Sequence, residues 1–130
     1  MAGGVSTPAL VAAVSNAGGL GMLPGGYRTP EQLVADIVDT RDLTEAPFGV
    51  NLFVPHRLDR ADLESRVAAY REALLPAAQR LGVTPGSPSW GDTDGWADKV
   101  ALVETLAPAV VSCTFGVPDP EAVDRWRAAG

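Results

Sequence analysis

The sequence predicts an α/β fold in which helices alternate with the strands of a parallel sheet. Three short apolar runs, bounded by glycine or proline, have the residue types and length of buried strands. Longer segments with apolar residues at helical spacing lie between these runs. A cap residue followed directly by proline opens three of the helical segments, at Thr7-Pro8, Thr29-Pro30 and Asp119-Pro120.

The first helix is expected to follow Thr7-Pro8, because Leu10, Val11 and Val14 recur at helical spacing and Gly18-Gly19 supplies a helix end. The segment from Leu20 to Leu23 then predicts a short buried strand, followed by a turn at residues 24–26.

The second helix opens with a capping box, in which Thr29 precedes Gln32 by three residues. Its apolar stripe runs from Leu33 to Val38. The run from Phe48 to Val54 is almost entirely apolar and predicts a strand covered on both faces.

A longer helix is expected over residues 61–81, with Pro76 kinking it or ending it early. Residues 83–95 carry prolines and glycines without periodicity and predict a loop, either a mobile lid or, more often in such cases, a plain surface loop. Another helix begins near Trp96, and Ala109 to Phe115 predicts a third buried strand. The last helix follows Pro120, with Val123 and Trp126 facing inward.

Composition excludes several classes of function. A formal net charge of −6, from acidic residues scattered along the predicted helices, argues against a nucleic-acid-binding surface. No apolar run is long enough to cross a bilayer, so we expect a cytoplasmic protein without membrane contact. Cys113 is the sole cysteine and His56 the sole histidine, so neither an internal disulfide nor a Cys/His zinc site is possible.

Ligand sites in parallel sheets lie at the carboxyl ends of the strands. Asn51 is a polar side chain within an apolar strand near such an end, and either contacts a ligand or ties down a neighbouring loop. Ser112 and Thr114 hold similar positions on the third strand. Cys113 is expected to be a small buried residue rather than a nucleophile, and His56 a solvent-facing loop residue rather than a base.

Glycines and other small residues open the chain, at Met1-Ala2-Gly3-Gly4, directly before the first helix. Such a segment lets a ligand approach the backbone and exposes amides to an anion or a flavin ring, or else it is a flexible terminus. A helix that follows at once suggests that a first strand is missing.

Four stretches together resemble the nitronate monooxygenase family, also called 2-nitropropane dioxygenases, which is related to flavin-containing enoyl-ACP reductases. They are residues 1–8 (MAGGVSTP), 15–21 (SNAGGLG), 47–53 (PFGVNLF) and 111–118 (VSCTFGVP). The resemblance implies a TIM-type (β/α)8 barrel, of which residues 1–130 would be about the first half of an incomplete FMN-binding domain, truncated at both ends and lacking the first strand.

The resemblance also implies a function and a set of cofactor contacts. The complete enzyme would use FMN and O2 to oxidise alkyl nitronates to carbonyl compounds and nitrite. Met1, Ala2, Gly3 and Asn51 match the family's FMN-contacting positions. The family's catalytic histidine has no counterpart before Gly130, so no residue here receives the catalytic role.

Three other readings stay open on the sequence. One is an enoyl-ACP reductase-like flavoenzyme, and another is a non-catalytic half-barrel remnant or interaction protein that exposes unpaired strand edges. The third is a flavodoxin-like flavin carrier, which suits the length but not the motifs.

Overall fold

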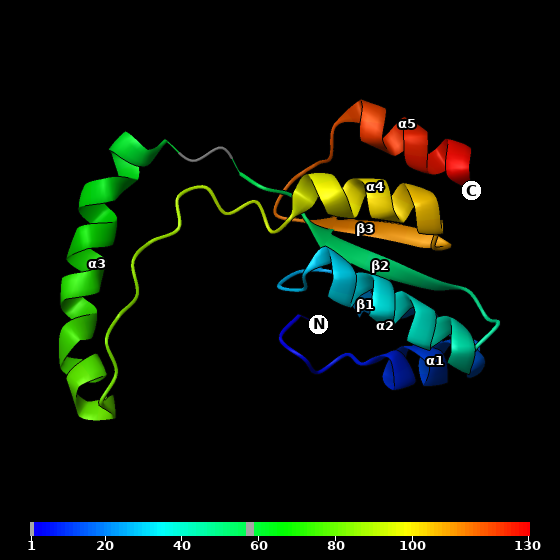
Figure 1. The fold of residues 1–130 in the computed structure, drawn as a ribbon, viewed down its shortest axis with the longest axis horizontal. Helices are drawn as coiled ribbons and strands as arrows, with labels where there is room; N and C mark the ends of the chain where they lie inside the picture. Colours follow the sequence, from blue (N-terminus) through cyan, green and yellow to red (C-terminus); the bar gives the residue numbers. More distant parts are fainter. Residues whose placement is uncertain (1, 57–58) are drawn as a thin grey trace. The chain divides into compact units, whose positions relative to one another are not determined.

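The computed structural model describes residues 2–56 and 59–130 and confirms the predicted order of helices and strands (Figure 1). The elements are α1 (Pro8–Asn16), β1 (Gly21–Pro24), α2 (Pro30–Leu43), β2 (Phe48–Phe53), α3 (Arg60–Leu81), α4 (Trp96–Leu106), β3 (Val110–Thr114) and α5 (Pro120–Ala129). The described chain forms two compact units, one made of residues 2–56 and 93–130 and the other of residues 59–92. No helix in these described ranges is long and apolar enough to span a bilayer.

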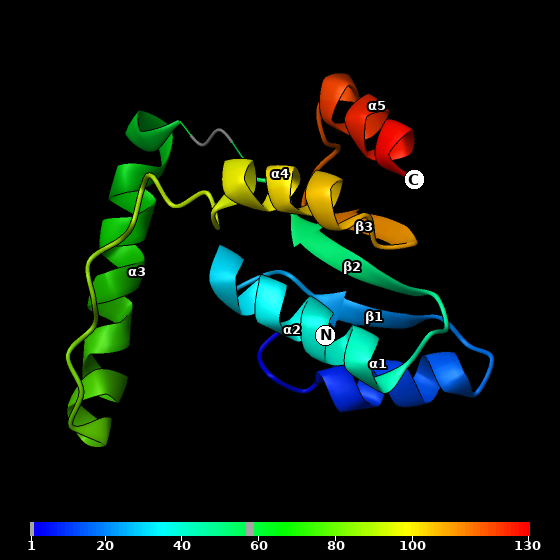
Figure 2. The ribbon, with the colours of Figure 1, turned by 45° about the vertical axis from the view of Figure 1, so that its right-hand side comes forward.

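The first unit is built on a parallel sheet with strand order β1-β2-β3, as the alternation of elements predicts (Figure 2). In register, Pro24 lies opposite Asn51, and Asn51 lies opposite Ser112. Because all the strands run the same way, their carboxyl ends meet at one edge of the sheet.

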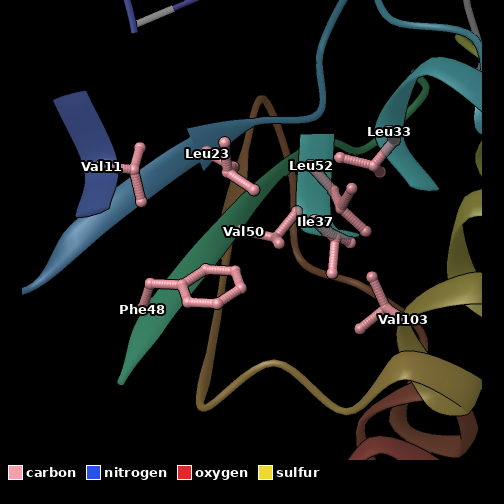
Figure 3. Packing of buried hydrophobic residues seen from close by; sticks show 8 residues of the cluster. All are labelled: Val11, Leu23, Leu33, Ile37, Phe48, Val50, Leu52 and Val103. Atoms are coloured by element: carbon pink, nitrogen blue, oxygen red, sulfur yellow. The ribbon is translucent and has the colours of Figure 1, made fainter. Parts of the chain in front are cut away.

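The core of the first unit lies between the sheet and its helices (Figure 3). Its strand residues alternate along β2, so that Phe48, Val50 and Leu52 face the helices. The cluster comprises Val11 from α1, Leu23 from β1, Leu33 and Ile37 from α2, Phe48, Val50 and Leu52 from β2, and Val103 from α4. Helices α1, α2 and α4 therefore cover one face, and the other face carries Asn51.

The helix starts follow from local chemistry. Thr7 Oγ1 accepts from the amide of Leu10, and Thr29 forms the predicted capping box with Gln32. Helix α5 begins at Pro120 as predicted, but the Asp119 side chain makes no capping hydrogen bond. Its backbone carbonyl accepts from the amides of Ala122 and Val123.

Two strand predictions need correction. The first strand begins at Gly21 rather than Leu20, which is 45% exposed. The third strand is not buried, because Val110, Ser112 and Thr114 share the Asn51 face of the sheet, which no described helix covers. Its residues are half-buried, and Val110 is 38% exposed.

The second unit consists of α3 and the segment that follows it. Pro76 does not end α3, which continues to Leu81 and stops where Gly82 takes a left-handed φ of 65°. The segment after Gly82 is a loop, as predicted, and it contacts α3. The Arg60 guanidinium lies 5.5 Å from the Trp90 ring centroid, and Arg71 donates to the Pro85 carbonyl.

Candidate functional site

The candidate site lies on the helix-free face of the sheet, at the carboxyl ends of its strands. Asn51 is its central polar side chain and is half-buried on β2. Asn51 Oδ1 accepts from Ser112 Oγ at 2.8 Å and from Thr114 Oγ1 at 3.1 Å. Within the described residues its Nδ2 makes no hydrogen bond, so its two N–H donors are unpaired there.

Three aromatic rings gather at the same edge, one from the end of each strand or the loop after it. Phe53 contacts Tyr27 edge to face, with centroids 5.2 Å apart, and contacts Phe115 in the same manner at 4.8 Å. Tyr27 and Phe115 have left-handed φ angles of 62° and 72°. Non-glycine residues keep such angles only where their surroundings fix them, so the backbone that carries these two exposed rings is held in place.

A hollow of about 390 Å³ opens beside β1, between the segment before α1 and the loop after β1. Its lining residues are Gly3, Gly4, Ser6, Thr7, Pro8, Pro24, Gly26, Tyr27 and Arg28. Gly3 and Gly4 have φ angles of 93° and 95°, and a Cβ built on either would meet no atom within 4 Å. Open backbone of this kind admits a ligand close to its amides.

The loop after β1 packs too tightly for side chains. A Cβ on Gly25 would lie 2.8 Å from the carbonyl oxygen of Asn51, and one on Gly26 would overlap the Phe53 ring. The Gly25 amide donates to the same carbonyl of Asn51 at 2.7 Å. The turn that borders the hollow is therefore attached directly to the strand that carries Asn51.

Charged residues fix the rest of this loop. Arg28 donates to both carboxylate oxygens of Asp36 on α2, at 2.7 and 2.6 Å. Lys99 on α4 reaches the Gly25 carbonyl and Asp94, each at 2.8 Å. Asp94 in turn accepts from the Tyr27 amide at 3.0 Å.

The structure brings together part of the predicted site. The Asn51 side chain bonds Ser112 and Thr114 on the neighbouring strand β3 rather than tying down a loop, and its contact with a ligand stays a prediction. Gly3 lines the hollow, and Ala2 is half-buried beside it in sequence. Met1 lies outside the described residues.

The remaining candidates lie away from this face. His56 is exposed, as expected of a loop residue. Cys113 alternates with Ser112 and Thr114 on β3 and pairs with Leu52, on the helix-covered side. Burial raises the pKa of the Cys113 thiol, which disfavours the thiolate that a nucleophile needs. Within residues 2–56 and 59–130, no three His, Cys, Asp or Glu side chains form a metal-binding cluster.

Sequence reasoning overlooked Tyr27, Arg28, Asp94 and Lys99. Tyr27 could have been found, because it follows the Gly25-Gly26 turn at a strand end. Lys99 carries no such signal, since a lysine on a helix is ordinarily solvated.

A family model described as nitronate monooxygenase matches residues 1–130. This chain belongs to the nitronate monooxygenase family. A nitronate monooxygenase from Pseudomonas aeruginosa is 39% identical over 130 residues, covering 98% of this chain and 36% of the relative. A probable nitronate monooxygenase from Bacillus subtilis is 35% identical and is likewise covered over 36% of its length.

Solved structures give the same result for this member of the nitronate monooxygenase family. A nitroalkane oxidase from Streptomyces ansochromogenes matches the whole chain with a TM-score of 0.91 and 43% identity, over 36% of its own length. FabK from Thermotoga maritima matches 96% of the chain with a TM-score of 0.58 and 25% identity. The chain thus has the α/β fold of the amino-terminal part of the Streptomyces enzyme, and spans little more than a third of the relatives it matches.

Proposed function

We propose that this chain is part of an FMN-dependent nitronate monooxygenase and supplies one wall of its flavin site. The observation that carries the proposal is the free amide of Asn51, held by Ser112 and Thr114 at the carboxyl ends of parallel strands. A site at this edge is where an α/β enzyme binds its ligand. Membership of the family supplies the reaction class.

The residues present fit a flavin. The hollow, at about 390 Å³, lies within the usual range for ligand pockets and is bordered by open glycine backbone. Tyr27 and Phe53 offer ring edges and faces to a flat aromatic group. Ala2 and Gly3, with Met1 by resemblance, would lie against the flavin through their backbone, and Asn51 would donate a hydrogen bond to an acceptor on its ring.

We further propose that residues 1–130 are part of one FMN-binding TIM-type barrel domain. Support comes from the sequential strand order and from helices that cover a single face. In a barrel the helices form an outer ring and the strands enclose the interior. The face with Asn51 would then be the interior one.

In this role the protein binds and orients rather than reacts. Bound FMN would supply the redox chemistry, passing electrons from an alkyl nitronate to O2 so that a carbonyl compound and nitrite form. The buried turn at Gly25-Gly26 and the aromatic rings would exclude water from one side of the ring system. We assign no proton transfer to a residue of this chain.

The test uses the protein as its gene encodes it. Flavin released by heating is identified by mass, and nitrite and O2 are measured with propyl nitronate as substrate. FMN together with nitrite release supports the proposal, and the absence of both would overturn it. A flavoprotein that oxidises NADH only with an enoyl thioester would instead be the reductase-like enzyme. A protein without flavin that self-associates on a sizing column would favour the non-catalytic reading.

A further inference from the structure

Lys99 is the least expected charged residue of the first unit. It lies on α4 and only 1% of its side chain is exposed. Its Nζ donates to the carbonyl of Gly25, 74 residues earlier in the chain, at 2.8 Å. It also lies 2.8 Å from Oδ2 of Asp94. A lysine is buried in this way only when its partners compensate for lost hydration.

Asp94 extends this contact to the next part of the loop. While Oδ2 faces Lys99, Oδ1 accepts from the backbone amide of Tyr27 at 3.0 Å. Both Tyr27 and Asp94 have left-handed φ angles, of 62° and 53°. Lys99 and Asp94 therefore hold the loop after β1 at two points, the Gly25 carbonyl and the Tyr27 amide. They fix a backbone conformation that tyrosine rarely adopts.

The residue held in this way faces the candidate site. Tyr27 lines the hollow and its ring packs against Phe53. Stability alone does not explain the ion pair, because buried ion pairs can often be replaced by apolar residues without loss. What apolar residues would not supply is the hydrogen bond to the Gly25 carbonyl.

We propose that Lys99, acting through Asp94, is a positioning residue that sets the loop Gly25–Tyr27 against bound flavin. The inference rests on the proposed function, because the loop matters only if the hollow receives the cofactor. Lys99 itself contacts no ligand in this account. It fixes the distance between the Tyr27 ring and the strand that carries Asn51.

The test compares flavin binding in the encoded protein with that of the double variant Lys99→Met and Asp94→Asn. This variant removes the charges together, keeps the side-chain sizes and retains an oxygen for the Tyr27 amide. Arg125→Met is the matched control, since it breaks an exposed ion pair with Glu104 of α4. The readouts are the Kd for FMN, the visible spectrum of the bound flavin, and melting of the flavin-free protein.

We expect the double variant to raise the Kd about tenfold or more and to alter the bound-flavin spectrum, because small misplacements of binding groups are costly. The control should leave both unchanged. A Kd and spectrum like those of the wild type would overturn the inference, whatever happens to melting. If the double variant does not fold, Asp94→Asn alone must show the same spectral change. Wild-type protein that binds no flavin would refute the proposed function and this inference with it.

Discussion

Replacing Asn51 with aspartate separates the two roles that its position allows. Asn51→Asp keeps the size and shape of the side chain and keeps Oδ1, which accepts from Ser112 and Thr114. It removes both N–H donors and places a second carboxylate oxygen in their position. A role in tying β2 to β3 would survive the change, whereas donation to a flavin would not.

The structure sets the expected magnitudes. Both hydroxyl donors keep an acceptor, and their bonds become charge-assisted, so we expect the free energy of unfolding to change by less than about 1 kcal/mol. An acceptor on the ligand that loses its donor costs about 1–3 kcal/mol. Each 1.4 kcal/mol is a factor of ten, so the Kd for FMN should rise about 5- to 150-fold.

Flavin fluorescence quenching gives the Kd, and urea unfolding gives the stability. Asn51→Ala is the control, because it deprives both hydroxyls of their acceptor and should cost about 1–3 kcal/mol of stability as well as affinity. If Asn51→Asp binds FMN as tightly as the wild type, the amide donates nothing to the cofactor. The reasoning also fails if the aspartate variant is as unstable as the alanine variant.

Four further predictions concern stability and reactivity. Gly25→Ala should lower the free energy of unfolding by about 1–3 kcal/mol in urea melts, because its Cβ would lie 2.8 Å from the carbonyl oxygen of Asn51. Leu52→Ala, at a fully buried position, should cost about 2–5 kcal/mol, and a smaller loss would mean that the core is looser than described. Thr29→Ala removes the capping box of α2 and should cost about 0.5–2 kcal/mol in thermal unfolding. Burial raises the pKa of the Cys113 thiol, so iodoacetamide should alkylate it more slowly at neutral pH than in the denatured chain. Because the unfolded chain loses the Cys113 thiol proton at a lower pH than the folded chain, the stability that this thiol contributes should fall as pH rises through the ordinary thiol range. An equal alkylation rate in the folded and denatured chains would contradict the raised pKa.

The fold was predictable where its signals are local. Thr29 and the glutamine three residues on define a helix start without reference to the rest of the chain, and the structure has that hydrogen-bonded pair. The apolar run from Phe48 to Val54, bounded by prolines, likewise predicted a strand, and β2 spans Phe48–Phe53. The exposure of Val110 was not predictable, because it depends on which face of the sheet the helices cover rather than on the residue itself.

The site was likewise predictable only where the signal is local in the sequence. Asn51 was identified because a polar side chain interrupts an apolar strand, and its partner Ser112 because it occupies a matching position on β3. Lys99 was not identified, since its burial depends on a hydrogen bond to the carbonyl of Gly25, which is 74 residues away in sequence. Tyr27 could have been found from its place after the Gly25-Gly26 turn, but its left-handed backbone could not, because it depends on the contact with Asp94.

A crystal structure of the encoded protein with FMN tests the central claim most directly. The account predicts flavin density at the carboxyl ends of β1, β2 and β3, with Asn51 Nδ2 within hydrogen-bonding distance of the ring and Gly3 backbone against it. Flavin bound elsewhere, or an Asn51 amide that faces only protein or solvent in the complex, would contradict it.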